Sequence, residues 1–279
     1  MERVARWARL ALLATLPGCA GAGSAGGLLP VQGEGPGQVA PLVVCIHGWC
    51  ADASYFDAFR RAWQGASIAI DLPGHGRADW HGESTVEELG SAVALTVDRL
   101  DAPSVVWVGH GLGGAVALSA AVQCSTPSLG LLALDCLQDL DRELPPDQWE
   151  PLVQAYRADF AGTLRSFAQQ AIPPGTLAPS LASGIADDLV LQRRDAALAV
   201  LAALPAATPE QDRAVLRLPI HAVLADLNQS VDAEGNGRGG SYTFTILPRS
   251  GHFLQLERPA EIASILAAQL VAWNHSPSR

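Results

Sequence analysis

The chain has 279 residues, of which 49% are hydrophobic, and a formal net charge of −10. This length and apolar content are sufficient for one large α/β domain, or for one domain with an insertion. Its 28 acidic residues outnumber its 18 basic residues, every basic residue is arginine, and no basic patch stands out. The charge distribution therefore gives no reason to expect a nucleic-acid partner.

Residues 1–27 have the character of an export signal. Three arginines precede the short apolar stretch Leu10–Leu16, and a run of small residues follows it. Such a segment is too short to span a membrane as a mature helix. Leu16-Pro17-Gly18-Cys19 also resembles a bacterial lipobox, in which Cys19 is the lipidated first residue. The sequence predicts export, with possible membrane attachment through Cys19; simple secretion and a cytoplasmic location with an N-terminal extension are the alternatives.

The next part of the chain alternates between apolar strands and helices. Residues 28–40 are expected to form a linker, because the region around them is rich in Gly, Ser and Pro. Predicted strands cover Leu42–Ile46, Ser67–Asp71, Ser104–Val108 and Leu129–Asp135, and predicted helices cover Ser54–Trp63, Val86–Leu100 and Leu112–Cys124. This alternation predicts an α/β fold with a mostly parallel central sheet that helices cover on both faces.

Residues 137–217 contain no convincing strand. They carry helical patterns that prolines interrupt, at Pro146–Phe160, Leu164–Gln170, Ala182–Leu191 and Arg194–Leu204. Strand patterns resume at Ile220–Leu224 and Tyr242–Leu247, and Ala260–Trp273 is a final amphipathic helix. Residues 41–136 and 218–279 are therefore expected to form the core, with residues 137–217 inserted as a helical cap after the strand that ends at Asp135.

The third predicted strand leads through Gly109-His110-Gly111-Leu112-Gly113 into a helix. A strand, a sharp turn and a helix are the setting of a nucleophile elbow, where flanking glycines let the chain reverse and lift the central side chain above the sheet. A serine at position 111 would complete a Gly-x-Ser-x-Gly motif. Because glycine has no side chain, the sequence predicts the scaffold of an acyl hydrolase without the attacking hydroxyl.

With three further signatures, this turn resembles the α/β-hydrolase superfamily, specifically its capped esterase and lipase-like branch. The signatures are His47-Gly48-Trp49, Asp71-Leu72-Pro73-Gly74-His75-Gly76 and Ser250-Gly251-His252-Phe253. The resemblance covers about Pro41 to Trp273. It implies a catalytic role for His252 and an oxyanion hole made of the backbone N–H groups of Trp49 and Leu112. It also implies structural roles for His47 and His110.

The resemblance places the catalytic acid at Asp226, at the end of the strand that follows the cap. Asp226 would bond one imidazole nitrogen of His252, fix its tautomer and stabilise the imidazolium. The alternative role for Asp226 is to cap a loop. Asp135, at the end of the preceding strand, is the second candidate acid, and Asp232 is a weaker third.

Three functional readings fit these residues. The favoured one is a non-catalytic relative that binds a small apolar carbonyl or ester ligand. The second is an active hydrolase that uses water activated by His252, or Cys50 as a substitute nucleophile. The third is an ordinary esterase or lipase that carries a Ser-to-Gly change. No cofactor or metal is implied, because the chain has neither a P-loop ending nor a Cys-x-x-Cys pair, and the sequence carries no signal for an oligomeric state.

Overall fold

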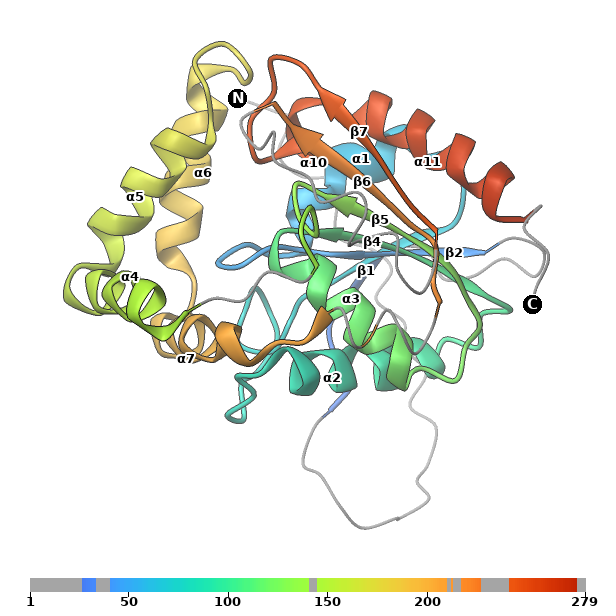
Figure 1. Cartoon of the computed structure of the whole chain (residues 1–279), viewed down its shortest axis with the longest axis horizontal. Coiled ribbons are helices and arrows are strands. Elements are labelled where there is room, and N and C mark those ends of the chain that lie inside the picture. Colours follow the sequence, from blue (N-terminus) through green and yellow to red (C-terminus); the bar gives the residue numbers. More distant parts are fainter. Residues whose placement is uncertain are drawn as a thin grey trace, which may run out of the picture.

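The computed structural model describes residues 27–33, 41–140, 145–209, 212, 217–226 and 241–274. Within these residues, seven strands form one sheet in the order β1-β3-β2-β4-β5-β6-β7 (Figure 1). All neighbouring strands are parallel except β1 and β3, which are antiparallel. The predicted α/β fold with a mostly parallel sheet is confirmed. The strands are β1 (Val31–Gly33), β2 (Leu42–Ile46), β3 (Ser67–Ile70), β4 (Val105–His110), β5 (Ser128–Leu134), β6 (Ile220–Ala225) and β7 (Tyr242–Leu247).

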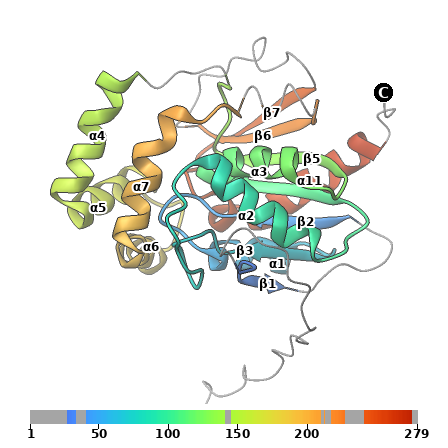
Figure 2. The same cartoon turned by 90° about the horizontal axis from the view of Figure 1, so that it is seen from below.

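Helices cover both faces of the sheet (Figures 1 and 2). On one face lie α2 (Val86–Asp98) and α3 (Leu112–Gln123), and on the other lie α1 (Asp57–Ala62), α10 (Leu254–Glu257) and α11 (Pro259–Asn274). Alternate residues of each central strand enter the two apolar clusters: Val44 packs on the α2–α3 side and Val43 on the α1–α11 side. Because both faces are buried, the strands read as continuous apolar runs.

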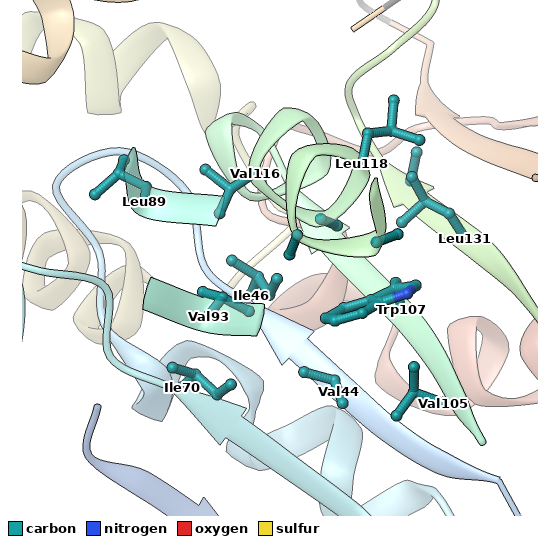
Figure 3. Close-up of a cluster of buried hydrophobic side chains, with 14 of the residues drawn as sticks. Val44, Ile46, Ile70, Leu89, Val93, Val105, Trp107, Val116, Leu118 and Leu131 are labelled. Atoms are coloured by element: carbon teal, nitrogen blue, oxygen red, sulfur yellow. The ribbon is translucent and has the colours of Figure 1, made fainter. Parts of the chain in front are cut away.

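Trp107 is the largest fully buried side chain in the cluster beneath α2 and α3 (Figure 3). It projects from β4 among Val44, Val105 and Leu131. Its indole N–H donates to the Ser128 hydroxyl, with the nitrogen and oxygen 2.9 Å apart. The indole thus fills the cluster and still satisfies its one polar group.

Replacing Trp107 with alanine is expected to lower the free energy of unfolding by about 3–5 kcal/mol, because the cavity left by a large aromatic side chain collapses only in part. Urea denaturation followed by circular dichroism measures this loss. Leu191→Ala is the control, since Leu191 is 80% exposed and its truncation is expected to change stability by no more than about 0.5 kcal/mol. Equal losses in the two variants would contradict the packing described here.

Part of the segment expected to form a linker is ordered. Val31–Gly33 forms β1 on the free edge of β3, and the Leu29 N–H donates to Thr96 Oγ1 at 3.1 Å. The prediction of a linker over residues 28–40 is therefore wrong for these positions. A three-residue strand carries no alternation, so its pairing depends on the edge that β3 offers. The expected export signal lies outside the described residues apart from Gly27, and so does Cys19.

Where the structure describes the predicted cap, four α-helices lie to one side of the sheet (Figures 1 and 2), and a short 3-10 helix, Leu204–Ala206, follows them. The four are α4 (Pro146–Ala158), α5 (Phe160–Ala171), α6 (Pro179–Leu191) and α7 (Arg194–Ala203). The Trp149 indole N–H donates to the Leu201 carbonyl at 2.8 Å and so joins α4 to α7. None of the helices that the structure describes is long and apolar enough to cross a membrane.

Candidate active site

The turn between β4 and α3 has the shape of a nucleophile elbow. Its central residue, Gly111, has φ +53° and ψ −120°, a backbone conformation that strains residues with a side chain. At Gly113 a Cβ would lie 2.1 Å from the Ile46 carbonyl oxygen, so only glycine lets the first turn of α3 approach β2 this closely. The chain therefore reverses sharply at Gly111, and α3 begins at Leu112.

His252 and Asp135 form a pair that faces this turn. A Cβ added to Gly111 would lie 3.6 Å from His252 Nε2. The other ring nitrogen, Nδ1, lies 2.7 Å from Asp135 Oδ2. A carboxylate only accepts hydrogen bonds, so Nδ1 carries the proton, and the Nε2 lone pair of the neutral ring remains available on the side of Gly111. This is the arrangement of a general base with its orienting acid.

Asp135 is held in place by its own contacts. Its Oδ1 accepts the Ala225 N–H at 3.0 Å, and its backbone N–H donates to the Val223 carbonyl at 2.8 Å. Its side chain is 2% exposed, whereas that of His252 is 24% exposed. A buried carboxylate that the backbone at the carboxyl end of β6 holds in place keeps the imidazole in one orientation.

The prediction that Asp226 bonds His252 is wrong. Asp226 Oδ2 accepts the Arg249 N–H at 2.7 Å, and its Oδ1 accepts the Ser250 N–H at 3.3 Å. Asp226 therefore caps the loop that precedes His252, and the second candidate, Asp135, is the residue that reaches the imidazole. The third candidate, Asp232, lies outside the described residues.

His110 supports His252 from the strand beneath it. The centroids of the two rings are 4.5 Å apart, and His110 Nε2 lies 2.9 Å from the His252 carbonyl oxygen, to which it donates. Burial, together with the neighbouring His252, lowers the pKa of His110 to about 3. His110 therefore stays neutral at physiological pH and adds no positive charge to the site. This role matches the structural part that the sequence predicts.

The loop that carries Trp49 runs beside the turn at Gly111. The Gly48 Cα lies 3.8 Å from the position of a Gly111 Cβ. His47 fixes this loop: its Nδ1–H donates to the Gly48 carbonyl at 2.8 Å, and its Nε2 accepts the Leu72 N–H at 3.0 Å. Leu112 is the first residue of α3. The backbone N–H groups in the first turn of a helix have no partner within that helix, and the N-terminal end of the helix dipole carries partial positive charge. The loop of Trp49 and the start of α3 thus lie side by side, and the oxyanion hole of Trp49 and Leu112 stays a prediction.

The cap is bonded to the loops that build the site. The His252 N–H donates to the Ala171 carbonyl in α5 at 2.8 Å, and the Trp49 indole N–H donates to the Ala197 carbonyl in α7 at 2.8 Å. The Gly76 N–H donates to Gln192 Oε1 at 3.1 Å. The cap therefore helps to position both His252 and Trp49. Sequence reasoning missed these contacts, because neither a backbone carbonyl in a helix nor a lone glutamine carries a sequence signal.

Aromatic side chains from the cap pack against His252 and Trp49. The Phe167 ring stands edge-on to the imidazole, with centroids 5.7 Å apart, and Tyr156 stands edge-on to Trp49 at 4.8 Å. One buried cluster joins the cap to the site loops; its members include Val153, Phe160, Leu164, Ile185, Leu189 and Phe253. These surroundings favour an apolar ligand over a highly charged one.

Cys50 follows Trp49 directly in the same loop but is fully buried. Burial raises the pKa of its thiol well above the usual range, which leaves the nucleophilic thiolate scarce. Within the ranges that the structure describes, no group of three or more His, Cys, Asp or Glu residues could hold a metal ion.

The parallel sheet, the elbow and the His–Asp pair define a protein built like a hydrolase. Residues 43–265 match the Alpha/beta hydrolase family, and the chain belongs to this family. Pimeloyl-[acyl-carrier protein] methyl ester esterase of Neisseria meningitidis serogroup A is 33% identical over 137 residues, which are 46% of this chain and 42% of that protein. Lipase LipV of Mycobacterium tuberculosis is 35% identical over 114 residues, 40% of this chain and 43% of the lipase.

Solved esterases have the same fold. A thermophilic esterase from Thermogutta terrifontis, in its malate-bound form, gives a TM-score of 0.75 at 19% identity, covering 88% of this chain and 93% of the esterase. An esterase from Exiguobacterium antarcticum gives a TM-score of 0.75 at 16% identity, covering 86% of this chain and 94% of the esterase. The matching segment spans only about half the length of the curated relatives, between 42% and 51% for the first three.

Proposed function

We propose that this protein is an α/β hydrolase of serine-esterase ancestry in which Gly111 stands at the position of the nucleophile. In this proposal the protein binds a small apolar carbonyl or ester ligand and does not form an acyl-enzyme. The relatives that are named esterases support the ancestry. The absence of a side chain at Gly111 supports weak or absent turnover, because removing a triad nucleophile costs about 10⁶-fold in rate.

The observation that carries the proposal is the distance of 3.6 Å between a Gly111 Cβ and His252 Nε2. A serine hydroxyl one bond beyond that Cβ would come within hydrogen-bond reach of the imidazole. In this proposal the His252–Asp135 pair faces the position at which a serine esterase carries its nucleophile. The decisive test is to restore serine at position 111 and look for an acyl-enzyme, as argued in the Discussion.

A second candidate function is slow hydrolysis by water. The 2.7 Å contact between His252 Nδ1 and Asp135 Oδ2 favours it, because a protein that only binds its ligand does not need a histidine–aspartate pair at this place. His252 would accept a proton from a water beside Gly111, and that water would attack the ester carbonyl directly. This route gives no covalent intermediate and no burst.

If the unmodified protein has residual esterase activity, Cys50→Ala is expected to leave the rate within about twofold, because the buried, protonated thiol is a poor nucleophile. His252→Ala is expected to abolish the same activity. Initial rates with a short activated ester measure both effects. A large loss in Cys50→Ala, with the fold intact by circular dichroism, would favour thiol attack instead.

We propose export as the location, on the basis of residues 1–27 and Cys19. A lipidated protein is expected in the membrane fraction, and Cys19→Ala is expected to release it. Recovery of the full-length chain from the cytoplasm, with Met1 to Gly18 still attached, would overturn this proposal.

The third functional interpretation is an ordinary esterase that carries an isolated Ser-to-Gly change. It also predicts that Gly111→Ser restores activity.

A further inference from the structure

We infer that Glu257 is a positioning residue for His252: its carboxylate holds the backbone on both sides of the histidine and so sets where the imidazole lies against Asp135. The inference rests on the proposed function in one respect, because that function makes His252 the base of the site. It deepens the function by giving the base a support outside the His252–Asp135 pair. The evidence comes from the hydrogen bonds of Glu257, from the cap and from the packing around Gly251.

One carboxylate accepts hydrogen bonds from the two residues that flank His252. Glu257 Oε2 accepts the Gly251 N–H at 2.8 Å, and Glu257 Oε1 accepts the Phe253 N–H at 3.2 Å. The Glu257 N–H donates in turn to the Phe253 carbonyl at 3.0 Å. Both flanking residues are buried, so their N–H groups need a partner inside the protein, and a carboxylate is a strong one. Glu257 therefore fixes the backbone just before and just after His252.

The N–H of His252 itself is held by the cap. It donates to the carbonyl of Ala171, the last residue of α5, at 2.8 Å. Three successive backbone N–H groups, at positions 251, 252 and 253, thus have fixed acceptors. This leaves the imidazole only its side-chain torsions, and Asp135 restricts these through the 2.7 Å contact with Nδ1. Such support matters for a base, because a displacement of about 1 Å can cost about 100-fold in rate.

The packing around Gly251 shows how closely these groups meet. A Cβ at this position would lie 2.5 Å from the Ala171 carbonyl oxygen and 2.9 Å from Glu257 Oε1. Because glycine has no Cβ, the cap and the carboxylate can both approach the same stretch of backbone. Gly251→Ala therefore disturbs the contact of Glu257 without changing Glu257 itself.

The tautomer of His252 tests the inference in the unmodified chain, where no catalysis is needed. In the full-length protein labelled with ¹⁵N-histidine, the chemical shifts of the two ring nitrogens report which one carries the proton, and His252→Gln identifies the signals. Near pH 8 the Nδ1–H form is expected to dominate, because Asp135 accepts that proton. Glu257→Gln keeps the size of the side chain but only one acceptor oxygen, and it is expected to raise the share of the Nε2–H form at least about twofold.

Glu88→Gln is the matched control. Glu88 Oε2 accepts the N–H groups of Ser84 and Thr85 at 2.9 and 3.0 Å, at the start of α2. This variant loses the same kind of bond in a helix that carries none of the site residues, so it is expected to lower the Tm and to leave the His252 tautomer unchanged. Thermal unfolding of each variant confirms that the spectra are recorded on folded protein.

Gly251→Ala is expected to raise the share of the Nε2–H form as Glu257→Gln does, because the added methyl group displaces the carboxylate. Gly184→Ala is its control, since nothing lies within 4 Å of a Cβ added at Gly184, and it is expected to leave the tautomer unchanged. The second pair of variants keeps the test decisive if Glu257→Gln does not fold.

Kinetics in the Gly111→Ser background separate positioning from general stability. Glu257→Gln is expected to lower kcat about 10- to 100-fold and to leave KM within about twofold, because it displaces the base and not the ligand. Glu88→Gln is expected to leave both constants within about twofold. Initial rates with a short activated ester, corrected for the folded fraction, measure the difference.

The inference is overturned if Glu257→Gln and Gly251→Ala leave the tautomer share unchanged, or if Glu88→Gln raises it as much as Glu257→Gln. It is also overturned if Glu257→Gln leaves kcat unchanged in an active Gly111→Ser chain. Failure of the proposed function is a different result. If the unmodified chain itself forms an acyl-enzyme, the proposed function fails, and the tautomer measurement still decides the role of Glu257.

Discussion

Gly111→Ser is expected to turn this protein into a burst-forming esterase, with a gain in rate on the order of 10³- to 10⁶-fold over the unmodified chain. The physical reason is that the base, its acid and the helix start at Leu112 are already in place. A serine hydroxyl near His252 Nε2 would be activated as soon as it is present. Release of p-nitrophenol from a short activated ester measures the gain, and mass spectrometry detects the acylated serine.

The gain in activity is expected to come with a loss of stability. Position 111 has φ +53°, and a side chain held in such backbone space costs about 1–3 kcal/mol. Gly111→Ala carries the same strain without a hydroxyl, so it is expected to lose similar stability and gain no activity. A folded Gly111→Ser variant that forms no acyl-enzyme would show that the site lacks more than its nucleophile, and the protein would then be better described as a binding module.

Within the Gly111→Ser background, Asp135→Asn is expected to lower kcat by about 10⁴-fold, the size of effect seen when a triad acid is made neutral and the histidine adopts the wrong tautomer. Asp226→Asn is the matched control. Because the contacts of Asp226 with the described residues are those with the N–H groups of Arg249 and Ser250, its replacement is expected to change kcat by less than about tenfold and to lower stability by about 1–2 kcal/mol.

Steady-state rates of the two asparagine variants, each corrected for the folded fraction, decide which carboxylate is the acid. The substitutions keep the size of each side chain, remove its charge and replace one acceptor oxygen with an amide donor. A larger loss in Asp226→Asn than in Asp135→Asn would mean that the loop before His252 rearranges when an ester is bound.

The strand and helix pattern of the core could be predicted because each element is long and uniform. The apolar runs of β2, β4 and β5 are buried on both faces, and a fully buried strand leaves that signature in any sequence. Thr85 and Glu88 form a capping box at the start of α2, close to where the sequence places that start. β1 was missed, because its three residues pair only where β3 offers a free edge.

The amino-acid sequence by itself determined the fold class, the sharp turn at Gly111 and the position of His252 before the last helix, because local patterns of apolar residues and glycines specify them. The choice between Asp135 and Asp226 was made only by the tertiary structure. Both aspartates follow buried strands, and their surroundings in sequence are equivalent. In three dimensions Asp226 is engaged by the N–H groups of Arg249 and Ser250, whereas Asp135 reaches the imidazole. Direction in space, and not residue type, separates the two carboxylates.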